Sequence, residues 1–175
     1  MIKLNAGKMI YIWAVLALIG CSDKKIAEKI NLADIPEQMI EEFRMIDTRM
    51  GMKNWKLEAV KASIYEGKAY IELEKPVMFF YEENEETSVI SGNKGSVDQN
   101  TKIIRLNENV VVDSSKEALK LKTEELFYDT ESKRIYSDEA VEIIRQGGIT
   151  KGVGFESDSG FNRILIKDNE TTIRN

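Results

Sequence analysis

The stretch IRLNENVVV, residues 104–112, alternates apolar and polar side chains up to a polar break, Asn107-Glu108-Asn109, and continues after it with three valines. Alternation with a period of two is typical of a β-strand with one buried face. The stretch returns 31 residues later, and an aspartate precedes it in both copies. The matched pairs are Asp98 and Asp129, Thr101 and Ser132, Lys102 and Lys133, Ile104 and Ile135, Glu108 and Glu139, Val110 and Val141, and Val112 and Ile143. The sequence therefore predicts a structural unit of about 30 residues that is repeated along the chain.

A further copy follows after a shift of 29 residues. Its matched pairs are Lys122 and Lys151, Leu126 and Phe155, Asp129 and Asp158, and Arg134-Ile135 and Arg163-Ile164. A looser, earlier copy sets Tyr70 and Val77 against Ile104 and Val110. Each unit is a strand, an Asp-led turn, a strand, a second turn and a strand, and it cannot bury its apolar face alone. We therefore predict an all-β domain of stacked units whose terminal edges are used for pairing with other proteins.

Residues 34–50, upstream of the repeats, have a different spacing. Five apolar side chains follow one another at intervals of one, three, three and four residues: Met39, Ile40, Phe43, Ile46 and Met50. This spacing predicts a short amphipathic helix, with Asp34 as its cap, Pro36 in its first turn and Gly51 after its end. The helix packs on its own domain, serves as a marginal linker helix, or docks on a membrane partner. Residues 22–33 are polar and predict a spacer.

The N-terminal segment resembles a bacterial lipoprotein signal. Lys3 and Lys8 precede an apolar run over residues 9–20, which is 12 residues long and shorter than the roughly 20 residues that span a bilayer as a helix. The run ends in Leu18-Ile19-Gly20-Cys21, which resembles a lipobox, in which the chain is cut before a cysteine that becomes lipidated. We therefore expect a signal peptide over residues 1–20 and lipid attachment at Cys21. The alternative is a short buried helix with an incidental thiol.

Composition excludes several classes of function. The chain has no histidine and one cysteine, so Ser-His-Asp and Cys-His catalytic arrangements, histidine-ligated zinc sites and cysteine clusters cannot be built. The net charge is −5, from 25 basic and 30 acidic residues without a basic stripe, so nucleic acid is not an expected ligand. Acidic pairs such as Glu82-Glu83 and Glu124-Glu125 are interpreted as solvated turns and strand edges rather than glycosidase carboxylates. We expect no enzyme activity, no cofactor and no bound metal.

Six short segments stand in a characteristic order. They are WKLEA (55–59) leading to Tyr65, LEKPV (73–77) with Phe79, SGNKGSVD (91–98), IRLNENVVV (104–112), LKTEELFYD (121–129) and GVGFESD (152–158). Their succession resembles the LptC family of the lipopolysaccharide-export pathway, with its LptA-like (OstA-type) repeats. The resemblance covers residues 55–166. It implies a twisted, boat-shaped β-jellyroll of antiparallel strands that is open along an apolar seam.

The resemblance also implies a non-catalytic lipopolysaccharide carrier. Such a protein receives lipopolysaccharide from an inner-membrane ABC transporter of the LptB/LptF/LptG type and passes it to an LptA-type bridge protein by pairing of edge strands. The resemblance implies that the transporter contact lies near residues 55–80 and the bridge contact at the C-terminal edge, residues 155–173. Family members commonly keep an N-terminal transmembrane helix, whereas here we expect a lipid anchor on the periplasmic side of the inner membrane. Because Ser22 rather than aspartate follows Cys21, the outer membrane stays open as an alternative.

A carrier of this kind needs an apolar trough, because exposing an acyl chain of about 12 methylenes to water costs roughly 10 kcal/mol. The inward positions predicted to contact lipid are Ile71, Leu73, Val77, Phe79, Ile104, Leu106, Val110, Val112, Leu121, Leu126, Tyr128, Ile135, Val141, Ile143, Ile164 and Ile166. Plain core packing is the alternative interpretation of the same residues.

Two rival functions stay open. One is a lipoprotein scaffold of the same fold that pairs strands with partners without carrying lipid. The other is a cell-wall hydrolase that uses two carboxylates. The expected organisation of the chain is a signal peptide over residues 1–20, a lipidated terminus, spacer and short amphipathic helix over 21–52, and the jellyroll domain over 53–175.

Overall fold

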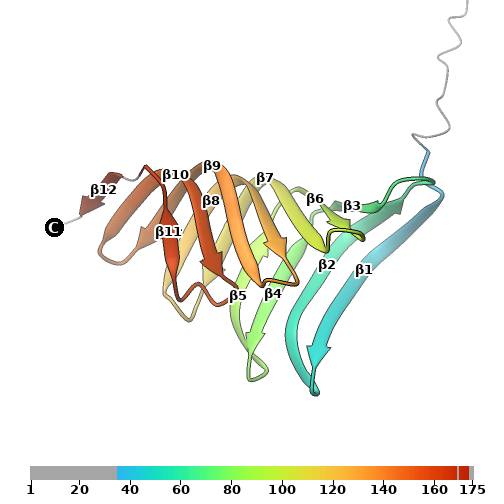
Figure 1. The fold of residues 1–175 in the computed structure, drawn as a ribbon, viewed down its shortest axis with the longest axis horizontal. Coiled ribbons are helices and arrows are strands. Elements are labelled where there is room, and N and C mark those ends of the chain that lie inside the picture. The colour runs from blue at the N-terminus through green and yellow to red at the C-terminus, as the bar shows by residue number, and fades with distance from the viewer. Residues whose placement is uncertain (1–34, 169, 174–175) are drawn as a thin grey trace, which may run out of the picture. The chain divides into compact units, whose positions relative to one another are not determined.

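The computed structural model describes residues 35–168 and 170–173, and within these ranges every regular element is a β-strand (Figure 1). The strands are β1 (Gln38–Arg49), β2 (Met52–Ile64), β3 (Tyr70–Glu74), β4 (Val77–Glu82), β5 (Glu85–Ser91), β6 (Lys94–Asp98), β7 (Ile103–Ser114), β8 (Leu119–Asp129), β9 (Arg134–Arg145), β10 (Gly148–Asp158), β11 (Ile164–Ile166) and β12 (Glu170–Ile173). The predicted all-β fold is confirmed. The predicted signal peptide and Cys21 lie outside the described residues.

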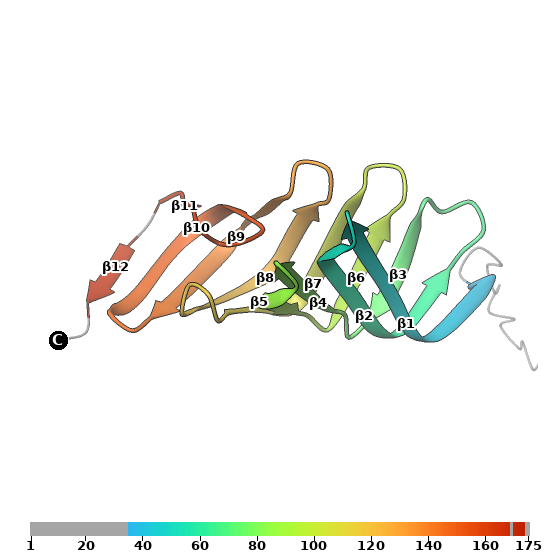
Figure 2. The same cartoon turned by 90° about the horizontal axis from the view of Figure 1, so that it is seen from below.

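The strands form two facing layers, and the long strands run through both (Figure 2). Layer A consists of β3, β6 and β11 with the adjoining halves of β1, β2 and β7 to β10, and layer B consists of β4, β5 and β12 with the other halves. The division is clear in β2, whose residues 61–64 pair with β3 while residues 55–58 pair with β4. In the same way, residues 104–107 of β7 pair with β6 and residues 111–114 pair with β5.

The long strands change layers at bends, which together we call the spine: Glu42, Val60, Glu108, Glu139 and Gly154. The polar break of the repeat is such a bend. Glu108 and Asn109 have φ angles of 63° and 59°, and the pairing of β7 with β8 is interrupted there. Left-handed backbone in a non-glycine residue ends regular pairing and turns the strand. Glu139 lies where the pairing of β9 with β8 is interrupted, so the bend recurs with the repeat.

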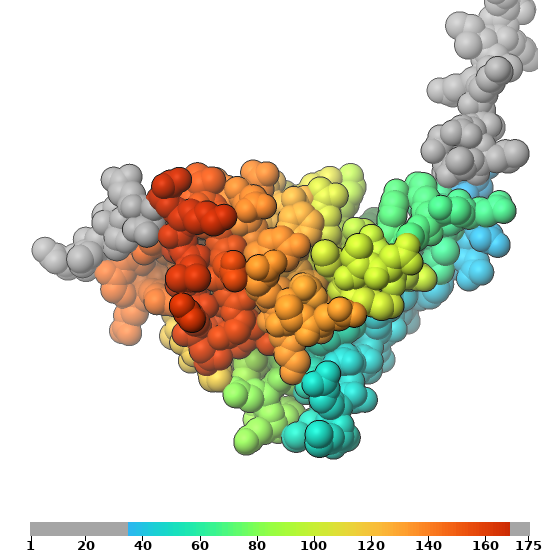
Figure 3. Space-filling view, in the orientation of Figure 1, coloured from blue at the N-terminus to red at the C-terminus, as the bar shows by residue number. Residues whose placement is uncertain are grey.

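Opposite the spine, the turns between strands form two rims. Rim A contains the turns of layer A, residues 65–69, 99–102, 130–133 and 159–163, and rim B contains the turns of layer B, residues 50–51, 83–84, 115–118 and 146–147. We call the line between the rims the seam. In Figure 3 the β1–β2 and β4–β5 turns of rim B, cyan and green, project at the bottom of the view.

The Asp-led turns predicted from the repeat all lie on rim A. The Oδ1 atom of Asp98 accepts hydrogen bonds from the backbone N–H groups of residues 100 and 101, at 2.8 and 2.9 Å. Asp129 accepts from residues 131 and 132 at 2.9 and 3.2 Å. Asp158 accepts from residues 160 and 162 at 2.9 and 3.0 Å. A short carboxylate that replaces the missing backbone partners closes such a turn, and the repeat therefore has the predicted physical basis.

The helix predicted over residues 34–50 is wrong, because this segment forms β1 and pairs with β2 along its length. The misleading interval of three arises at the bend. Ile40 lies opposite buried Ala62, and Phe43 lies opposite buried Ala59, so both face inwards across Glu42, whose φ is 52°. Pairing satisfies the backbone groups on that edge of β2, which a short isolated helix would leave open. The sheet therefore begins before the predicted boundary at residue 53.

Candidate functional site

The candidate site is the interior between the two layers, which is one continuous apolar cluster. Most of the positions predicted to face inwards are buried in it: Ile71, Leu73, Ile104, Leu106, Val110, Val112, Leu121, Leu126, Tyr128, Ile135, Val141 and Ile143. Ile164 and Ile166 are partly buried and pack against this cluster from β11. The structure therefore brings these residues from many turns of the repeat onto one inner surface.

Val77 and Phe79 are placed differently. In β4 the buried residues are Met78 and Phe80, and Val77 and Phe79 are half-buried on the opposite face. The Nζ atom of Lys56 lies 4.0 Å above the Phe79 ring on that outer face. The inward orientation predicted for these two residues is wrong, because the chain passes from layer A to layer B between β3 and β4, and the φ of 49° at Lys75 shifts the alternation by one residue.

Twelve further residues of the cluster were not among the predicted positions. They are Phe43, Trp55, Leu57, Ala59, Ala62, Met78, Phe80, Ile90, Val97, Leu119, Phe155 and Phe161. The alternation of Trp55, Leu57 and Ala59 along β2 was a signal that could have identified three of them. Phe161 had no such signal, because it lies in a turn.

The two long sides of the interior are held in different ways. Along the spine, backbone hydrogen bonds join the crossing segments: Lys75 N–H to Asn93 O at 2.8 Å, Gly92 N–H to Pro76 O at 3.1 Å and Asn93 N–H to Glu108 O at 2.9 Å. The bent strands themselves also run through this side. The spine is therefore closed by covalent chain and by main-chain pairing.

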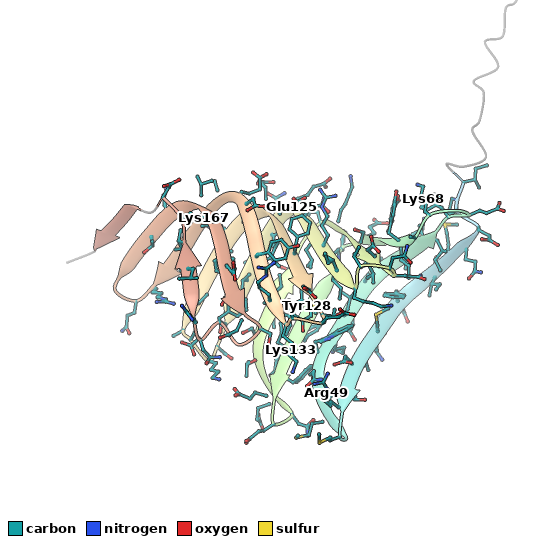
Figure 4. All side chains as sticks on the ribbon, viewed as in Figure 1. Arg49, Lys68, Glu125, Tyr128, Lys133 and Lys167 are labelled. Atoms are coloured by element: carbon teal, nitrogen blue, oxygen red, sulfur yellow. The ribbon has the colours of Figure 1, made fainter. Side chains whose placement is uncertain are left out.

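The seam is closed by side chains. Tyr128, on β8 in layer A, lies near rim A in Figure 4, and its ring meets two aromatic rings of layer B edge-on. The centroid distances are 4.9 Å to Phe80 and 6.4 Å to Trp55. The backbone hydrogen bonds of the rim turns run within a rim, as from Thr130 N–H to Lys102 O in rim A and from Ser115 N–H to Thr87 O in rim B. The two layers are thus held together here by packing.

A cleft of about 380 Å³ opens at the seam. Its rim B wall contains Met52, Phe80 and Thr87, and its rim A wall contains Lys133 and Asn162. A larger hollow of about 730 Å³ lies elsewhere, and its lining is mainly polar and charged, with residues such as Lys61, Glu72, Lys94 and Arg105. Each of the two has one wall residue that belongs to the apolar interior: Phe80 in the seam cleft and Leu73 in the larger hollow.

The electrostatics of the titratable groups follow from burial and turn geometry. Burial raises the pKa of the Tyr128 hydroxyl, and the carboxylates of Asp47 and Asp129 raise it further. Backbone N–H donors in the rim A turns lower the pKa of Asp98, and the Ser132 side chain and backbone donors do the same for Asp129. Each shift has a structural cause, and none of these groups forms a base or nucleophile aimed into a cleft.

Within residues 35–168 and 170–173, no group of three or more acidic or sulfur side chains is arranged to hold a metal ion. A search of the same residues for a helix long and apolar enough to cross a bilayer finds none.

Comparisons with known proteins agree with this geometry. The sequence profile of the family described as "Lipopolysaccharide-assembly, LptC-related" matches residues 9–174. No curated protein sequence matches the chain. Among solved structures, the fold is similar to the crystal structure of LptH, the LptA-homologous periplasmic component of the lipopolysaccharide transport device of Pseudomonas aeruginosa. The TM-score is 0.53 at 11% sequence identity, over 69% of this chain and 95% of that one.

The profile extends over nearly the whole chain, and the antiparallel sheet is the LptA-like jellyroll that the family resemblance implied. The description of the family connects its members with lipopolysaccharide assembly. The chain belongs to the LptC-related family of lipopolysaccharide-assembly proteins.

Proposed function

We propose that this protein carries lipopolysaccharide with its acyl chains held between layers A and B. The observation that carries this proposal is the asymmetry of the interior. One continuous apolar surface is enclosed by main chain on the spine side, but only by packed side chains such as Tyr128 and Phe80 on the seam side. A lipid whose polar head stays in water and whose chains need an apolar wall enters such a space sideways, through the seam.

Side chains fill the interior in the described conformation. Leu57, Met78, Leu106, Val112 and Leu121 have no exposed surface. Acyl chains therefore enter only when the layers part at the seam and these side chains turn to line the trough. The roughly 10 kcal/mol gained by removing one chain of about 12 methylenes from water offsets the loss of packing across the seam.

The two ends of the sheet suit a relay. At the N-terminal end, β1 pairs with β2 on one edge, and no other strand of the described residues pairs with its second edge. Met39 and Ile46 on β1 are exposed, and we assign this end, with β2 to β4, to the ABC transporter. At the C-terminal end the edge consists of the short strands β11 and β12, and we assign it to an LptA-type bridge protein. Edge-to-edge pairing would continue the sheet from one protein to the next.

We further propose that the domain is tethered to the periplasmic face of the inner membrane through a lipid on Cys21. The support is the lipobox-like sequence that ends in this residue. Labelling of cells with an alkyne-tagged fatty acid tests this proposal. Label on the full chain and its loss in Cys21→Ala are expected, and equal labelling of the two would contradict it.

Site-specific photo-crosslinking tests the carrier function. A benzophenone amino acid at Val112 or Ile143, which face the interior, should form adducts with lipopolysaccharide in cells. Phe79, on the outer face of β4, is the matched control and should form none. Adducts from Phe79 alone, or from none of the three positions, would refute an internal lipid path.

A scaffold without lipid is the second candidate, and the packed interior favours it. On that hypothesis the layers stay closed and only the edges β1 and β11–β12 act. Mass spectrometry of the protein purified without detergent separates the two functions, because a carrier retains lipopolysaccharide and a scaffold retains none.

A further inference from the structure

The largest fully buried side chain in the described part of the protein, Phe161, lies in a turn and not in a strand. It belongs to the rim A turn at residues 159–163, which joins β10 to β11. Its ring is stacked near that of Phe155, with centroids 6.3 Å apart and planes at 25°. The flanking residues Asp158 and Asn162 are exposed. One side chain of a surface turn therefore fills the interior at its C-terminal end.

Phe161 departs from the repeat to which its turn belongs. The other two Asp-led turns have hydroxyl residues, Thr101 and Ser132, at the third position after the aspartate, and Phe161 occupies that position here. Its φ of 58° is left-handed, a conformation that costs an aromatic residue about 1 kcal/mol or more. The sister turns also contain a left-handed residue, Lys102 with φ 60° and Lys133 with φ 57°, and both lysines are exposed. Burial of the left-handed side chain therefore distinguishes the 159–163 turn from the other two.

The hydrogen bonds described for this turn are internal to it. Asp158 Oδ1 accepts from the backbone N–H of Gly160 and from the backbone and side-chain amides of Asn162, and Phe161 N–H donates to Asp158 O. The turn is therefore a small rigid unit, and the Phe161 ring is what fastens it to the apolar interior.

A second observation points to a ligand in the same region. Ser157, the last inward-facing residue of β10, is 4% exposed, and its hydroxyl oxygen has no hydrogen-bond partner. In register it lies beside Ile135 and Ile164, so its surroundings are apolar. A buried hydroxyl without a partner is unfavourable by about 1–3 kcal/mol, and such a group in a native interior calls for an explanation.

We propose that the 159–163 turn is a lid, that Phe161 is its plug, and that the space under the plug is an acyl-chain subsite in which Ser157 hydrogen-bonds a polar atom of the lipid. This inference rests on the proposed carrier function. The plug lies beside β11, where we assign the bridge protein, so its removal opens the interior at the end from which lipid would leave. When the turn swings outwards, a polar atom of the lipid can approach Ser157 and give its hydroxyl the missing partner.

Binding of cis-parinaric acid, an 18-carbon fatty acid whose fluorescence rises in apolar surroundings, tests the proposal on the full chain. In Phe161→Ala the plug is gone, and the apparent affinity should rise at least about threefold because the open fraction of molecules increases. Gly160→Ala keeps the plug and loosens the lid, because its Cβ would lie 2.4 Å from the Asn162 Nδ2 atom, and it should raise the affinity in the same direction. Adding Ser157→Ala to Phe161→Ala should remove most of that gain.

Phe79→Ala is the control, since Phe79 lies on the outer face of β4, far from β11 in the order of strands. It removes an aromatic side chain without touching the interior or the lid, and its affinity should equal that of the wild type. Affinity unchanged in both Phe161→Ala and Gly160→Ala, or raised equally by Phe79→Ala, overturns the lid while leaving the carrier function intact. If neither the wild type nor any variant binds the probe, and the crosslinks at Val112 and Ile143 are also absent, the carrier function itself fails.

Discussion

Replacing Phe80 by alanine should destabilise the protein far more than the same replacement at its neighbour Phe79. Phe80 is 2% exposed and its ring meets Tyr128 across the seam at 4.9 Å. Removing a buried phenylalanine costs about 3–5 kcal/mol, of which about 0.5–1.5 kcal/mol belongs to the aromatic pair. Phe79 is half-buried on the outer face, under the Lys56 ammonium group, and its loss should cost about 1 kcal/mol.

Thermal unfolding followed by the β-sheet circular dichroism signal measures the difference. For a chain of this size, 1 kcal/mol corresponds to about 2–4 °C in Tm. Phe80→Ala should therefore lower Tm by about 6–20 °C and Phe79→Ala by about 2–4 °C. The two variants lose the same type of side chain and differ only in the face of β4 from which it is removed. Equal losses, or a larger loss in Phe79→Ala, would refute both the alternation assigned to β4 and the closure of the seam by Phe80.

Three further results are expected. Ile166→Pro should abolish pull-down of an LptA-type partner, because proline disrupts strand pairing at the C-terminal edge, and undiminished pull-down would contradict the assignment. The Ser132 side chain and backbone donors lower the pKa of Asp129 in the folded protein, so the ionised carboxylate stabilises the fold at pH values above its ordinary pKa of 3.8. This contribution is lost as the pH falls below that value. The decrease in Tm between about pH 5 and pH 3 should therefore be smaller in Asp129→Ala than in the wild type. Gly95→Ala should lower Tm strongly, because its Cβ would lie 2.5 Å from the Arg105 carbonyl oxygen, whereas Gly147→Ala, with nothing within 4 Å, should leave Tm nearly unchanged.

The class of fold and its internal repeat were predictable because both depend on local patterns. Period-two alternation around Ile104 and Leu106 identifies strands. The spacing of Asp98, Asp129 and Asp158 marks turns in which the carboxylate accepts hydrogen bonds from backbone N–H groups in each copy. The polar break at Glu108 also recurs in the sequence, and in the structure it is the bend between layers.

Other features depend on contacts between distant residues and were mispredicted or missed. The spacing of Ile40 and Phe43 matches a helix, and only their pairing with Ala62 and Ala59 across the bend reveals a strand. The alternation of inward and outward side chains along β3 does not continue into β4, because the left-handed φ of Lys75 shifts it by one residue. Phe80 therefore faces the interior, where the sequence pattern predicted Phe79. Phe161 was missed for a third reason: nothing in the composition of a turn tells which of its side chains points inwards.

The repeat of strand, rim A turn, strand and bend has a consequence for how the length of the protein can change. Each unit adds a hairpin to both layers at once, so inserting or deleting one 31-residue copy, between Asp98 and Asp129 for example, alters the long dimension by two strand spacings, about 9–10 Å, and leaves the pairing on either side intact. Chains of different reach across the same aqueous gap could therefore arise by whole-unit duplication, with no redesign of either end.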